Sequence, residues 1–109
     1  MEGMHQITSG ELVKLSEQEC IDCDKDSFGC KGGWPDNCFW YVHDNNGINL
    51  DEKYPYMGYA DRCFAPYNGP VTVSTVNHVP AYTEGDLLAA IAKTPVAVSI
   101  MAGNDPFLT

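Results

Sequence analysis

The chain has 109 residues, a length that suits one small domain or a piece of a larger one. Its hydrophobic fraction of 44% and charged fraction of 19% are typical of globular proteins and argue against a disordered chain. The formal charge of -9 disfavours nucleic acid or an anionic membrane surface as a partner. No apolar run approaches the roughly 20 residues of a membrane helix, so we expect no membrane span.

Five cysteines in so short a chain indicate an oxidising compartment and at least one disulfide. Because the number is odd, at least one thiol must be free or bonded outside the chain. The spacing alone leaves the pairing open. No secretory signal pattern precedes the domain, and residues 1–7 read as the inside of a helix, so we expect a truncated chain.

Three helices are predicted in the first half of the chain. Helical spacing favours one over residues 1–8, ended by Gly10. The capping-box pattern of Ser16 and Glu19 opens a short helix to about residue 23. A stronger helix is expected over about residues 34–44, closed by Asn45-Asn46-Gly47. Its buried face would consist of Pro35, Cys38, Phe39 and Val42.

The second half predicts a loop, two strands and one more helix. Residues 48–69 carry turn signals such as Asn68-Gly69. Residues 71–76 and 96–101 have the β-branched content and alternation of strands. Between them, residues 83–93 indicate a helix with Thr83 and Asp86 as its capping pair.

The stretch from Cys23 to Pro35 predicts a backbone-binding ledge beside an apolar pocket. Cysteines seven residues apart, with turn-forming residues between them, are typical of a loop held by covalent ties. Gly32 and Gly33 carry no Cβ, so another backbone can come close. Trp34 then supplies a large apolar face, and proline suits the first position of the following helix.

Several linked motifs in this order resemble the papain family of cysteine peptidases. They are SEQECIDCD, FGCKGGWPDN, NNGINLDEKYPY, EGDLLAAIAKTPVAVSI and the NDPF ending. The resemblance implies an α+β, papain-like cysteine proteinase fold that is incomplete here. Residues 1–70 would form the helical, disulfide-tied portion of the left domain, and residues 71–109 the beginning of the β-barrel right domain. In the family, a peptide substrate lies in the cleft between the two domains.

The activity implied by the resemblance is peptide-bond hydrolysis through a cysteine acyl-enzyme. The family's nucleophile and oxyanion-hole glutamine would lie before Met1, and its catalytic histidine and asparagine after Thr109. None of the five cysteines, and none of His5, His43 and His78, matches a catalytic position. We therefore expect no catalytic residue and no peptidase activity in these 109 residues. The alternative is a non-catalytic peptide-binding or inhibitor-like module, which the flanking sequences would distinguish.

The resemblance also implies six substrate-binding residues: Phe28, Gly32, Gly33, Trp34, Pro35 and Ser99. Gly33 would pair its amide and carbonyl with the substrate backbone. Trp34 and Pro35 would form the mouth and wall of the pocket for the second residue before the scissile bond, with Phe28 at the next pocket. Ser99 stands where an apolar wall residue is usual, which makes the pocket roomier and slightly polar.

For the cysteines, the resemblance implies a disulfide between Cys23 and Cys63. Cys30 matches a cysteine whose partner precedes the nucleophile, so it would be unpaired or paired outside the chain. Cys20 and Cys38 depart from the family pattern. They are interpreted either as two buried thiols that act as small hydrophobes or as an additional bridge between the second and third helices.

The other cysteine, histidine and charged side chains are interpreted without a catalytic or metal-binding role. Zinc ligation by the cysteines is disfavoured, because the second pair is not C-x-x-C and one cysteine falls within a helix, so we expect no metal and no cofactor. We expect His5, His43 and His78 at the surface. His5 and His78 have no acidic or thiol neighbour at a telling spacing in the sequence. Five charged residues are read as solvated, although the first resembles a buried family residue: Glu17, Glu19, Asp51, Glu52 and Lys53.

The expected partners are a peptide or protein substrate and, in the parent protein, cystatin-like or propeptide inhibitors. Disulfides and the resemblance favour a secreted, lysosomal or vacuolar location. Because only two strands of the right domain are present, apolar side chains would be left partly uncovered: Leu87, Leu88, Val96 and Val98. We expect the chain to need its missing parts, a partner chain or a dimer to be well ordered.

Overall fold

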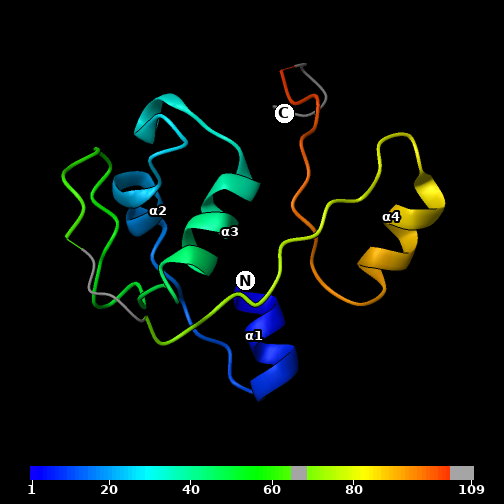
Figure 1. Cartoon of the computed structure of the whole chain (residues 1–109), viewed down its shortest axis with the longest axis horizontal. Helices are drawn as coiled ribbons and strands as arrows, with labels where there is room; N and C mark the ends of the chain where they lie inside the picture. The colour runs from blue at the N-terminus through cyan, green and yellow to red at the C-terminus, as the bar shows by residue number, and fades with distance from the viewer. Residues whose placement is uncertain (65–68, 104–109) are drawn as a thin grey trace.

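The computed structural model describes residues 1–64 and 69–103 of the chain. Their order is α1 (Glu2–Ser9), α2 (Glu17–Cys23), the 3₁₀-helix η1 (Gly29–Lys31), α3 (Pro35–Asp44) and α4 (Glu84–Ile91) (Figure 1). The predicted turn at Asn68 and the NDPF motif lie outside the described residues. No described helix is long and apolar enough to cross a membrane.

The local signals for the first three helices are confirmed. Gly10 ends α1 with a positive φ of 80°. The Ser16 hydroxyl accepts the Glu19 amide proton at 3.0 Å and so caps α2. Pro35 begins α3, and beyond its end the Gly47 amide donates to the Val42 carbonyl at 2.9 Å with Gly47 at φ 135°. These ends form where predicted because each depends on residues within one helical turn.

The predicted buried face of α3 is only partly right. Val42 is fully buried, and Cys38 and Phe39 are partly buried. Pro35 is exposed, because α3 begins at the surface at the end of an exposed run, residues 30–35.

The second half of the chain differs more from its prediction. The helix over residues 83–93 is present as α4, but its predicted cap is wrong: the Thr83 hydroxyl donates to the Pro80 carbonyl instead of capping α4. The strands predicted at residues 71–76 and 96–101 do not form. Among the described residues, β-pairing is limited to the isolated bridges Leu15–Leu50 and Ile48–Val71. A strand needs a continuous ladder of backbone hydrogen bonds with a neighbour, and in the described residues the pairing of these segments stops at the Ile48–Val71 bridge.

The core lies where α3 meets the two isolated bridges. Its buried residues are Leu15, Val42, Ile48 and Val71. The segments that carry Gly47 and Gly69 cross very closely. A Cβ on Gly47 would collide with the backbone of Gly69, and a Cβ on Gly69 would collide with the backbone of Ile48. This crossing brings Ile48 to Val71, whose backbones exchange hydrogen bonds of 2.8 and 3.4 Å. The division into domains at residue 70 stays a prediction.

Candidate peptide-binding site

Two disulfides fix α2 to its surroundings. Cys23 is bonded to Cys63, with Cα atoms 4.8 Å apart, which is the pair that the resemblance implies. Cys20 is bonded to Cys38, with Cα atoms 5.6 Å apart, so α2 and α3 are cross-linked. The structure therefore agrees with the interpretation of Cys20 and Cys38 as an additional bridge and not with that of two free, buried thiols. Cys30 is a free, exposed cysteine.

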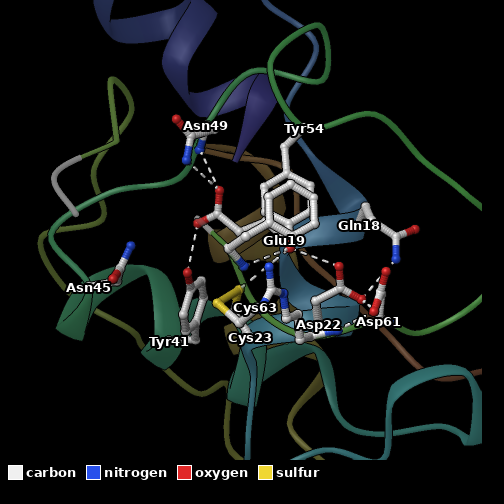
Figure 2. Close-up of a disulfide and its surroundings, with 12 residues drawn as sticks. Gln18, Glu19, Asp22, Cys23, Tyr41, Asn45, Asn49, Tyr54, Asp61 and Cys63 are labelled. Carbon is white, nitrogen blue, oxygen red and sulfur yellow. Dashed lines mark hydrogen bonds between the residues drawn. A yellow bond between two sulfur atoms is a disulfide. The ribbon is translucent and has the colours of Figure 1, made fainter. Parts of the chain in front are cut away.

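A buried carboxylate joins α2, α3 and the segment that follows α3 (Figure 2). Glu19 is fully buried. Its Oε1 accepts the Asn49 backbone amide at 2.9 Å and the Asn49 side-chain amide at 2.8 Å, and its Oε2 accepts the Tyr41 hydroxyl at 2.7 Å. These three charge-assisted hydrogen bonds offset the cost of removing the carboxylate from water.

The reading of Glu19 as a solvated charge is therefore wrong. The burial implied for Glu17 is also wrong, because its side chain is exposed and pairs with Lys14, whose pKa that hydrogen bond raises. A sequence signal was available: within the predicted helix, Glu19 and Cys23 are four residues apart, the spacing of one helix face. Both are buried.

A second polar cluster attaches the loop after residue 54 to α2. The Tyr54 hydroxyl donates to Asp22 Oδ2 at 2.8 Å, and the Tyr54 ring stacks on Phe64 with centroids 4.2 Å apart. Burial, followed by the hydrogen bond to Asp22, raises the pKa of Tyr54 to about 12. The other Asp22 oxygen accepts the Gln18 side-chain amide and the Asp61 backbone amide, each at 2.9 Å. These contacts lie beside the Cys23–Cys63 disulfide in Figure 2.

Five of the six predicted substrate-binding residues lie together in what we call the ledge, residues 28–35. Phe28 and Trp34 are exposed large hydrophobics, at 76% and 66%. Gly32 has a φ of 123°, a conformation that favours glycine. The Phe28 amide donates to the Gly32 carbonyl at 2.8 Å, which folds the ledge back on itself.

Gly33 presents its backbone at the surface of the ledge. It is exposed, and its amide and carbonyl take part in none of the backbone hydrogen bonds among the described residues. A Cβ at this position would collide with the Ser27 side chain, so a larger residue would displace its neighbour. An extended peptide can therefore pair with Gly33 without first breaking a bond in the protein.

Ser99 is not joined to the ledge by any interaction in the described part of the chain. It is exposed on the segment of residues 96–103, which is orange to red in Figure 1. Two cavities open elsewhere: one of about 420 Å³ beside the start of α1 and the Cys20–Cys38 bridge, and one of about 630 Å³ between Ile7 and residues 91–98.

Two of the three histidines, His43 and His78, pair with carboxylates. His43 Nδ1 lies 2.9 Å from Asp44 Oδ1, and its ring meets Trp40 edge-on. His78 Nε2 lies 3.2 Å from Asp36 Oδ2, a partner 42 residues away that sequence spacing does not indicate. His43 and His78 are exposed as expected, whereas His5 is partly buried. The described residues contain no group of three or more side chains arranged as metal ligands.

Comparisons with known proteins agree on one family. The family model for papain family cysteine proteases matches residues 1–109. Caricain from Carica papaya is 46% identical over 98% of this chain and 31% of its own length. Zingipain-2 from Zingiber officinale is 39% identical over 98% of this chain and 49% of its own length.

A solved structure shares the fold. The Carica candamarcensis cysteine protease in complex with E-64 superimposes with a TM-score of 0.84 at 36% identity, covering 98% of this chain and 51% of that one. The chain thus spans about half the length of the first curated relatives that it matches. These neighbours are cysteine proteases and do not favour a non-catalytic module. With the family model matched from end to end and the fold shared, the chain belongs to the papain family of cysteine proteases.

Proposed function

We propose that this chain supplies the peptide-binding side of the cleft of a papain-like cysteine endopeptidase. In such an enzyme, a cysteine thiolate attacks the peptide carbonyl, and water later hydrolyses the acyl-enzyme. The observation that carries the proposal is the exposed, unbonded backbone of Gly33 beside exposed Trp34, within a chain that matches the family throughout. A substrate would add to Gly33 as a strand, with an apolar side chain against Trp34 and Pro35.

The proposal also holds that these 109 residues do not cleave peptides by themselves. Four of the five cysteines are held in disulfides and so offer no thiolate. Cys30 is free, but the ring nitrogens of His43 and His78 contact carboxylates instead of its sulfur. In the described part of the chain, no hydrogen bond or ion pair joins the Cys30 thiol to a histidine, which supports this part of the proposal.

The proposed partners are a peptide or protein substrate and, for the whole protein, inhibitors that occupy the same cleft. Support comes from the Carica candamarcensis relative, which binds E-64. A secreted, lysosomal or vacuolar location is proposed on the strength of the two disulfides.

Binding can be tested by titrating the ¹⁵N-labelled chain with N-acetyl-Leu-Gly-amide, a short peptide without a reactive group. We expect a saturable shift of the Gly33 amide resonance. Trp34→Ala should weaken binding at least fivefold, whereas Tyr82→Ala, at another exposed aromatic, should leave it unchanged. Saturable binding that leaves Gly33 unperturbed would contradict the site.

Hydrolysis can be tested with a fluorogenic dipeptide amide, with and without iodoacetamide. We expect no turnover above background from the 109-residue chain. Turnover that is abolished by iodoacetamide and by Cys30→Ala would show that Cys30 is a nucleophile. It would contradict the proposal that these 109 residues bind a peptide without cleaving it.

A further inference from the structure

The ledge has almost no apolar anchor of its own. From Lys25 to Pro35 no residue is buried, and the two large hydrophobics of this stretch, Phe28 and Trp34, face solvent. Its internal hydrogen bonds are local: the Phe28 amide to the Gly32 carbonyl, and the Lys31 amide to the Phe28 carbonyl at 3.0 Å. Such bonds set the shape of the ledge but do not fix where it stands relative to the core.

One contact holds the middle of the ledge, where Gly29 in η1 lies close to Ile21 of α2 and to Ala60. The residues on either side of η1 depend on the ties at the two ends.

Upstream of the ledge, before the connecting residues 24–27, Cys23 is buried and bonded to Cys63. At its exit, Pro35 begins α3, and Cys38 lies in the first turn of that helix, bonded to Cys20. The Cys20–Cys38 bond spans 18 positions of sequence and thereby closes a ring that contains the whole ledge.

The remaining links at the exit are weak or distant. An exposed hydrogen bond of 3.1 Å joins the Asn37 side chain to the Asp26 carbonyl. The exposed His78–Asp36 pair reaches the same turn of α3, and exposed pairs of this kind stabilise little. The partly buried Tyr41–Glu19 bond also joins α3 to α2, but at the next turn of α3, farther from the ledge.

We infer that the Cys20–Cys38 disulfide positions the peptide-binding ledge by locking the first turn of α3 against α2. This inference rests on the proposed peptide-binding function of Gly33 and Trp34. The bond touches no substrate and acts through the helix that carries the ledge. Without it, the ledge would remain attached at Cys23 and at η1, but the residues on either side of η1 would sample several positions, and a bound peptide would have to select one of them.

The test compares the unaltered ¹⁵N-labelled chain with the variant Cys20→Leu/Cys38→Ala, which keeps apolar side chains between the helices but removes the tie. We expect amide order parameters at Phe28 and Gly33, on either side of η1, to fall from about 0.85 to below about 0.6. The amides of Ser16 and Ile48, bonded to Asn49 and Val71 in the core, should stay rigid. Affinity for N-acetyl-Leu-Gly-amide should fall at least fivefold.

Leu12→Ala serves as the control, because it removes an exposed apolar side chain outside the ledge and away from both disulfides and should change neither measurement. Unchanged order at the ledge, or an equal loss of order at Ser16 and Ile48, would overturn the inference. If the unaltered chain binds no peptide, the proposed function fails, while the order parameters still decide whether the disulfide positions the ledge.

Disulfide mapping of the unaltered, unreduced chain keeps the inference falsifiable if the double variant does not fold. A protease digest should release the Cys20 and Cys38 segments as one linked species. Quantitative alkylation of both thiols before reduction would overturn the inference.

Discussion

Two regions of this chain use similar side chains in opposite ways. In the inner region, residues 15–71, apolar and polar groups are buried around α2 and α3 and tied by two disulfides. In the outer region, residues 72–103, no described residue is buried, although the sequence is rich in valine, leucine and isoleucine. Composition is therefore not what separates the regions. The inner region is stabilised because its segments return to one another, whereas the outer region has no second layer among the described residues.

The strand-like segments make the same point. Residues 71–76 alternate between apolar and polar side chains as a strand should. In the described structure, however, the β-pairing of this segment is limited to Val71, which pairs with Ile48 at the core. Residues 96–101 alternate equally well and have exposed Val98, Ile100 and Met101. A period of two shows that a segment suits a sheet, and the sheet forms only when another strand lies beside it.

The largest difference between the regions should come from the same substitution made in each. Ile48→Ala removes a side chain that is 1% exposed and should lower the free energy of unfolding by about 4 kcal/mol. Ile91→Ala, at a side chain that is 56% exposed, should change it by less than about 0.5 kcal/mol. Urea unfolding followed by tryptophan fluorescence measures both. Equal losses would show that the outer region is buried in solution.

A matched pair of glutamates sharpens the description of the inner region. Glu19→Ala leaves the buried Asn49 donors and the partly buried Tyr41 hydroxyl without their acceptor, and should lower the free energy of unfolding by about 3 kcal/mol. Glu17→Ala, two residues earlier and exposed, should have little effect in the same unfolding experiment. A small loss for Glu19→Ala would mean that water or another acceptor replaces the carboxylate.

Alkaline pH should weaken the inner region through Tyr54. Its folded pKa is raised from 10.0 to about 12, so the neutral hydroxyl is favoured by folding. The resulting stabilisation is fully present below pH 10.0 and is lost as the pH rises toward about 12. Urea midpoints measured from pH 8 to 11 in a Cys30→Ala background, which prevents disulfide exchange, should fall above pH 10. Tyr54→Phe should flatten this fall, and Tyr82→Phe should not.

The smallest effect on stability is expected where a charge is placed in the outer region. Val98→Lys changes an exposed side chain that lines the cavity of about 630 Å³ together with Ile7 and Ile91. It should leave the unfolding free energy within about 0.5 kcal/mol but reduce self-association, measured by sedimentation velocity. Leu12→Lys, at a similarly exposed leucine outside this cavity, should not. If the two lysine variants reduce self-association equally, the apolar surface around this cavity is not its cause.

The sequence by itself determined the four α-helices, the ends of the first three, the family and the segment that carries the ledge. Ser16, Pro35 and Gly47 act through hydrogen bonds or dihedral angles within a few residues, so their meaning is local. The pairing of Cys23 with Cys63 followed from the resemblance, since spacing alone left it open.

Only the tertiary structure decided how Glu19 and Cys20 are used and that residues 71–76 stay without a sheet. Glu19 reads as a surface charge until Asn49, 30 residues later, supplies two donors. Cys20 is ambiguous until α3 brings Cys38 to it. Burial, cross-linking and strand pairing are properties of two segments at once, so one segment's pattern shows what it can do and its neighbour decides what it does.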